Sequence, residues 1–158
     1  MAIAASERRS RTRKVRAMFT LQLPCYESWE MDANAEKFVI TIVGAEDVAA
    51  ELKTMTNGKT VLGRSIDVVP VSTTSDLPKS NVVYVSPKHA DKARSIVKGQ
   101  HGHNTLFVGG ESGMGDTGVQ VALVGQGDKV GFEWSKRNVK NGGVKISPKV
   151  LNLGKELN

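Results

Sequence analysis

Short apolar runs alternate with polar segments of helical periodicity along most of this chain. The runs that are almost continuously apolar span residues 38–43, 66–71, 82–85 and 105–108. Such runs are typical of parallel strands that are covered on both faces. Residues 46–55 and 87–98 carry apolar positions at helical spacing, and Ser86-Pro87 fits an N-cap followed by the first helical residue. Strand–helix alternation of this kind predicts right-handed crossovers and a mostly parallel sheet, and Pro70 predicts a sheet edge at the end of its strand.

The alternation of predicted strands and helices changes in the last forty or so residues. Two β-prone runs, 119–124 and 130–134, follow each other with only a glycine-containing turn between them, which predicts an antiparallel hairpin. The second run alternates apolar and polar residues, the period of a half-buried strand. A polar connector, 135–141, leads to Ser147-Pro148, which predicts the start of a short helix. We therefore expect an α/β fold, a single-domain layered sandwich with a mostly parallel central sheet, an antiparallel C-terminal hairpin and a short closing helix.

Composition and charge narrow the classes of function. The chain has 158 residues, 39% hydrophobic and 24% charged, which fits one globular domain. Of the net charge of +6, residues 1–16 contribute +5, with six basic residues against one acidic residue. We expect residues 1–14 to form a basic N-terminal arm and residues 15–158 to form the α/β domain, and we expect residues 7–28 to include a helix. The body is nearly neutral and only 5% of residues are aromatic, which disfavours nucleic-acid binding.

The sequence motifs that could indicate a cofactor, phosphate or metal site are all incomplete. Residues 113–118 fit the spacing G-x-G-x-x-G, but a strand rather than a helix is predicted to follow, which indicates a flexible loop instead of a dinucleotide site. Asn57-Gly58-Lys59-Thr60 ends like a phosphate loop but lacks its first glycine and preceding strand. His101-Gly102-His103 has a metal-like spacing without a third ligand, and Cys25 is the single cysteine. We therefore expect no enzyme activity, no cofactor and no metal.

The C-terminal segment carries a resemblance to a known family. Its matching residues are Phe132, Glu133, Gly143, Val144, Lys145, Ile146, Ser147, Leu151 and Leu153. This segment resembles the C-terminal signature of the YfiR-like family, and the order of predicted elements extends the resemblance from about Val15 to Leu157. The chain departs from that signature at Trp134, Ser135, Gly142 and Pro148.

The resemblance implies a non-enzymatic periplasmic regulatory protein that binds and restrains the sensor part of a membrane-bound diguanylate cyclase. It implies that this chain begins after a removed signal peptide, and it leaves room for a homodimer. The partner-binding candidates are Phe132, Glu133, Lys145 and Ile146, beside the Gly142-Gly143 turn. For Glu133 two alternatives stay open, a salt bridge to a lysine (Lys129, Lys136 or Lys145) or presentation to the partner.

A second class of function is also compatible with the predicted fold. In open parallel sheets, ligands bind outside the carboxyl ends of the strands. Here those ends carry Gly44 and the glycine-rich residues 109–118. The alternative is therefore a periplasmic domain that binds a small molecule or a peptide.

Overall fold

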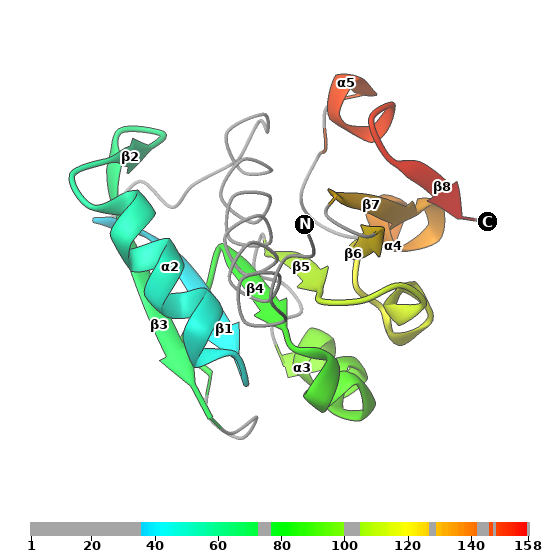
Figure 1. Cartoon of the computed structure of the whole chain (residues 1–158), viewed down its shortest axis with the longest axis horizontal. Coiled ribbons are helices and arrows are strands. Elements are labelled where there is room, and N and C mark those ends of the chain that lie inside the picture. Colours follow the sequence, from blue (N-terminus) through cyan, green and yellow to red (C-terminus); the bar gives the residue numbers. More distant parts are fainter. Residues whose placement is uncertain are drawn as a thin grey trace, which may run out of the picture.

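The computed structural model describes residues 36–72, 77–99, 105–126, 129–141, 146 and 148–157. The predicted basic arm and first helix, the His101-Gly102-His103 motif, the Gly142-Gly143 turn and Lys145 lie outside these residues. Among the described residues, one sheet of eight strands forms the body of the molecule, in the order β2-β3-β1-β4-β5-β6-β7-β8 (Figure 1). The strands are β1 (Lys37–Val43), β2 (Thr60–Val61), β3 (Arg64–Val71), β4 (Val82–Val85), β5 (Leu106–Gly109), β6 (Val121–Gln126), β7 (Lys129–Ser135) and β8 (Lys155–Leu157).

Strand directions confirm the predicted architecture. The neighbours β3, β1, β4, β5 and β6 are all parallel to one another. β6 and β7 form the antiparallel hairpin, in which Leu123 lies opposite Phe132. β8 is parallel to β7 and closes one edge of the sheet. At the other edge, β2 pairs with β3 only at Arg64 and Ser65, so the Pro70 end of β3 lies at a sheet edge, as predicted.

Short helices connect the strands and cover the sheet. They are α2 (Glu46–Thr56), η1 (Pro87–Lys92), α3 (Ala93–Gly99), η2 (Met114–Thr117), α4 (Lys136–Asn141) and α5 (Pro148–Leu151), where η marks a 3-10 helix. Leu52 of α2 packs in one hydrophobic cluster with Tyr84, whereas Ile96 of α3 packs in a second cluster with Val83. Neighbouring residues of a strand point to opposite faces. The helices α2 and α3 therefore cover opposite faces of the sheet.

Buried hydroxyl and amide groups tie the middle of β1 and the starts of β4, β5 and β6 together. The hydroxyls of Thr41 and Ser80 lie 2.6 Å apart, and Thr105 Oγ1 donates to the Ser80 carbonyl over 2.6 Å. Gln120 Oε1 accepts from the Phe107 amide over 2.7 Å. Each such bond contributes only about 1 kcal/mol net, but an unpaired buried group costs more than that. The network therefore favours one alignment of β1, β4, β5 and β6.

Three local predictions need correction. The predicted helix at 87–98 is a 3-10 turn joined to α3, with non-helical angles at His89. The predicted connector 135–141 contains α4, because Ser135 Oγ accepts from the Asn138 amide over 3.2 Å and caps the helix. The expected closing helix is present as the four-residue α5, but it does not end the fold, since β8 follows it.

The strand β7 also differs from its prediction. Its alternating sequence predicts a half-buried strand, yet Phe132, Glu133 and Ser135 are all buried. Phe132 contributes to the cluster that contains α2, and the opposite face of β7 is covered by the segment after β5. A strand with only one covered face alternates cleanly, and here tertiary contacts cover the second face.

The approach of β8 to β7 depends on a glycine, and this gives a first prediction. A Cβ at Gly154 would collide with the ring of Phe132, so we expect Gly154→Ala to destabilise the fold by about 1–3 kcal/mol. Thermal or urea unfolding measures this loss of folding stability. Gly131→Ala is the matched control, since its Cβ would meet nothing within 4 Å, and we expect it to be nearly neutral. Equal stability of the two variants would contradict the packing of Phe132 on Gly154.

Candidate functional site

The structure buries most of the residues that the sequence marks as partner-binding candidates. Phe132 and Ile146 are 6% and 7% exposed and belong to the same hydrophobic cluster. Glu133 is 7% exposed and points to the opposite face of β7. Lys145 lies outside the described residues. Phe132 and Ile146 come together in space, but their side chains are packed inside the fold.

Glu133 is held by the segment that follows β5. Its carboxylate accepts from the Gly113 amide over 2.6 Å and from Ser112 Oγ over 3.1 and 3.2 Å. Of the lysines proposed as its partners, Lys136 lies 4.0 Å from Glu156 instead. The carboxylate therefore binds neutral donors of a loop, an arrangement that neither of the two sequence-based alternatives includes. A buried carboxylate needs such donors, because losing its hydration is costly.

The glycine-rich segment 110–118 is a loop with a 3-10 turn and several hydrogen bonds to neighbouring elements. It contains η2, flanked by Gly113 and Gly118 at φ angles of 90° and 107°, which favour glycine. Asn138 of α4 donates to the carbonyls of Gly115 and Val119 over 2.7 and 2.8 Å. Together with Glu133, this side chain fastens the loop to β7 and α4. The strand β6 follows η2 directly, so the segment lacks the helix that a dinucleotide site needs.

Solvent-exposed groups gather at the C-terminal edge of the sheet, beside this fastened loop. Two large hydrophobic residues are exposed in the described part of the chain. Leu153 is the more exposed of the two, at 77%. Lys155 and Glu156 of β8 are also exposed. The resemblance already includes Leu153, but β8 has no clear signal in the sequence, because its three residues carry little hydrophobic pattern. This edge lies outside the partner surface that the sequence predicts, which consists of Phe132, Glu133, Lys145 and Ile146.

A cavity of about 400 Å³ lies at the carboxyl ends of β1 and β3. Its lining includes Gly44, Glu46, Asp47, Ser72, Lys88 and His89. Gly44 has a φ of 73°, which favours glycine, and a Cβ at this position would collide with the ring of His89. The crossovers from β1 and β4 lead to opposite ends of the sheet, so the switch point at which α/β folds bind ligands lies between these two strands. Gly44 follows β1 and Lys88 and His89 follow β4, which places the cavity beside this point. Of the two regions expected to form a ligand site, Gly44 lines this cavity, and residues 109–118 do not.

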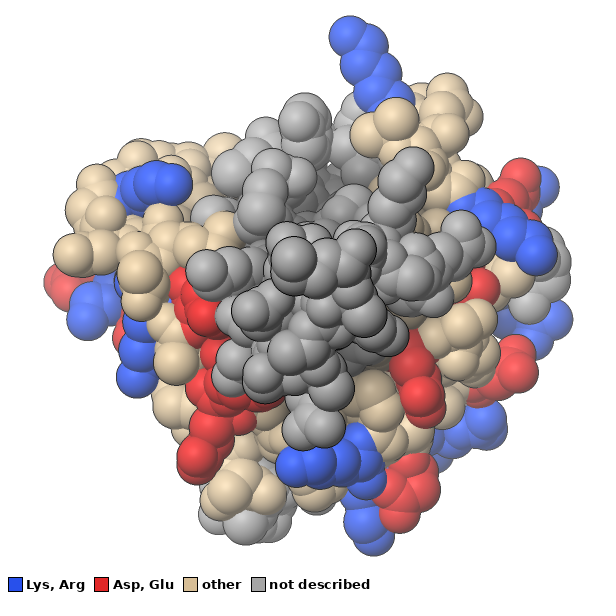
Figure 2. Space-filling model, viewed as in Figure 1, with Lys and Arg blue, Asp and Glu red and all other residues tan. Residues whose placement is uncertain are grey.

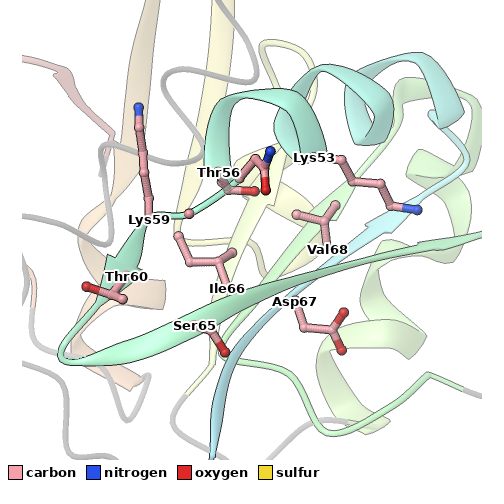
Figure 3. A pocket seen from close by; sticks show the side chains of 10 residues that line it. Lys53, Thr56, Lys59, Thr60, Ser65, Ile66, Asp67 and Val68 are labelled. Carbon is pink, nitrogen blue, oxygen red and sulfur yellow. The ribbon is translucent and has the colours of Figure 1, made fainter.

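A second cavity, of about 380 Å³, lies between the end of α2 and β3 (Figure 3). Lys53 and Lys59 both line it, yet Figure 3 shows their side chains extending in different directions. Lys59 belongs to the segment that ends like a phosphate loop. Because the two ammonium groups point in different directions, they are not placed to bind the same phosphate group.

On the face in Figure 2, basic and acidic side chains are interspersed over the described part of the surface. In the residues with described placement, no three His, Cys, Asp or Glu side chains lie close enough to hold a metal ion. None of the described helices has the length and apolar character that crossing a bilayer requires.

Comparisons with known proteins concern the family and the fold. A protein-family model described as YfiR/HmsC-like (DUF4154) matches residues 13–155. A comparison with curated proteins found no match.

Solved structures share the fold at low sequence identity. An ABC domain in complex with L-Trp from Streptococcus pneumonia has a TM-score of 0.61 and 12% identity, over 90% of this chain. A conserved domain protein from Vibrio cholerae O1 biovar eltor has a TM-score of 0.58 and 13% identity, over 93% of this chain. This chain spans 60% of the length of each of these two structures. At such identities the likeness shows the fold alone.

Removing the Glu133 carboxylate provides the second prediction. Glu133→Ala leaves the Gly113 amide without its acceptor, so we expect a loss of about 1–3 kcal/mol and a loosened loop. Hydrogen exchange of the amides of 110–118 measures the loosening directly. Glu133→Gln keeps one acceptor oxygen and should lie between Ala and the parent. The matched control is Glu111→Ala, whose side chain is exposed in the same loop. Unchanged exchange in Glu133→Ala would contradict the proposed fastening of the loop.

Proposed function

We propose, from the premise that this chain belongs to the YfiR/HmsC-like family, that it binds the periplasmic sensor part of a membrane diguanylate cyclase and restrains the enzyme. Family membership supports a periplasmic regulator of diguanylate cyclase in coarse terms, with a regulatory rather than a catalytic role. The observation that carries the proposal is the extent of the match. Residues 13–155 include the whole central sheet and reach into β8, so the family's C-terminal region is present in this fold.

The proposed mechanism is differential binding. A regulator restrains a receptor when it binds the inactive state more tightly than the active state and so shifts the population toward the inactive one. Moving a two-state receptor from about 99% active to about 99% inactive needs a difference in affinity of about 10⁴-fold. No chemical step is required of the regulator.

The predicted partner-binding residues take two different roles in this proposal. Phe132, Glu133 and Ile146 act as positioning residues, because they are buried and hold β7, the loop and the C-terminal segment in place. Lys145 remains a candidate for direct contact with the partner. A homodimer of this chain is compatible with the proposal and belongs among the oligomeric states to be measured.

A small-molecule site is the second candidate function, and the cavity at the carboxyl ends of β1 and β3 favours it. Its volume of about 400 Å³ lies in the range of ligand pockets. Two acidic residues, Glu46 and Asp47, and one basic residue, Lys88, are among its lining residues, which suits a small polar ligand with groups of both charge signs. Occupation of this cavity would provide a signal input to the regulator.

Deletion of the protein tests the leading function. We expect cellular cyclic-di-GMP and biofilm to rise in the deletion strain, because the cyclase loses its restraint, and to fall again when the parent protein is supplied. Both are measured directly, by mass spectrometry of the nucleotide and by biofilm staining. A strain that lacks the diguanylate cyclase is the control and should not respond to the deletion. Levels that do not change on deletion would rule out the restraint.

Filling each cavity in turn tests the second function. In a metabolite screen by thermal shift, a ligand of the first cavity raises the unfolding temperature of the parent protein. Ser72→Trp should fill this cavity and abolish the shift. Ser65→Trp is the matched control, since Ser65 is also exposed and lines the second cavity, and it should keep the shift. A shift that survives Ser72→Trp, or the lack of any shift across the screen, would count against a ligand at this site.

A further inference from the structure

The two edges of the sheet differ in how well they could accept another strand. At the β3 edge, Pro70 has no amide hydrogen to donate, and β2 already covers Arg64 and Ser65. At the opposite edge, β8 pairs with β7 on one side and, within the described part of the chain, with nothing on its other side. Figure 1 shows β8 and β2 at opposite ends of the molecule. The β8 edge contains no proline, so its backbone groups can pair with an added strand.

The β8 edge is held in place by its contacts with the rest of the domain. Its register with β7 runs from Glu133 opposite Lys155 to Ser135 opposite Leu157. Gly154 packs on the ring of Phe132, and Leu157 Cδ1 approaches Gly115 of the fastened loop. A docking strand therefore meets an edge that is already ordered, which reduces the entropy lost on binding.

The exposed side chains at this edge indicate what it would bind. Leu153 is 77% exposed just before β8, and burying a leucine is a common source of binding energy. Lys155 and Glu156 follow it with exposed charges of opposite sign. The surface thus combines unpaired backbone groups, one apolar anchor and a short charge pattern.

We propose that the β8 edge, with Leu153, docks an extended segment of the periplasmic sensor part of the cyclase, which adds as a strand beside β8. This inference rests on the proposed function and deepens it by identifying the surface and the binding mode. The segment carries an apolar side chain over Leu153 and an acidic group opposite Lys155, whereas Glu156 already has Lys136 of this chain 4.0 Å away.

The charges on β8 argue against a second copy of this chain as the occupant. Two identical edges related by a two-fold axis pair antiparallel, and the side chains that lie opposite each other must share a face. An axis at residue 156 places Glu156 opposite the same residue of the copy, and an axis at residue 155 does the same with Lys155. An axis at residue 157 avoids this, but only Leu157 then faces the β8 of the copy. Like charges directly opposite each other destabilise a sheet. A partner with a different sequence avoids this repulsion.

Photocrosslinking from the two edges tests the docking site. A benzophenone amino acid is placed at position 153 or, as the matched control, at position 62, where Leu62 is 45% exposed in the turn between β2 and β3. Both proteins are crosslinked in native membranes. We expect position 153, and not position 62, to give an adduct with the diguanylate cyclase, with the crosslinked peptide in its periplasmic part. Adducts from both positions or from position 62 alone, or an adduct at position 153 with a second copy of this chain, would overturn the docking site.

A substitution then separates this inference from the proposed function. Leu153→Asp should weaken binding to the purified sensor domain by about 10- to 100-fold, the loss expected from exposing one leucine. Its unfolding temperature should not change, because Leu153 is already exposed. Leu62→Asp should bind like the parent. If deletion raises cyclic-di-GMP but Leu153→Asp restores restraint fully, the docking site is wrong and the proposed function stands. If deletion has no effect, the proposed function itself fails.

Discussion

Burial of both faces of the central strands is the constraint on which the rest of this structure depends. The four residues of β4 are all buried, and they alternate between two hydrophobic clusters. Each cluster needs its own cover, so α2 packs on one face and α3 on the other. Fully burying one such side chain contributes about 1.5–3 kcal/mol, which outweighs the weak helical propensity of these short segments. The opposite directions of the two crossovers leave a cavity at the carboxyl end of β1.

The same constraint explains the polar groups inside the fold. Once both faces are covered, Thr41, Ser80, Thr105 and Gln120 lie away from water, and each finds a partner within the sheet or its connections. Burying Glu133 costs more free energy than burying these groups, because a carboxylate loses more hydration than a hydroxyl. Its bonds to Ser112 and Gly113 join β7 to the loop after β5. The C-terminal strands are thereby fastened to the parallel part of the sheet.

This arrangement places two kinds of candidate site on different elements. Charged residues of both signs line the cavity at the end of β1, whereas the edge at β8 exposes Leu153 and, among the described residues, pairs with no strand beyond β7. No lining residue of that cavity belongs to β7, β8 or the loop at 110–118. Variants in the cavity and variants at the edge can therefore be compared in the same protein without acting on the same side chains.

The sequence by itself determined the architecture, because continuous apolar runs and helical periodicities report directly on how many faces of an element are buried. It also placed the hairpin of β6 and β7, the sheet edge at Pro70, and the family resemblance in the C-terminal segment. Tertiary structure alone decided the surroundings of Glu133, since its donors, Ser112 and Gly113, are twenty or so residues away along the chain. It also decided that β8 exists, because a three-residue strand is stabilised by pairing with β7 and by the fit of Gly154 on Phe132 rather than by its own pattern. Local pattern shows which residues avoid water, whereas the identity of their neighbours depends on contacts between segments that are distant in sequence.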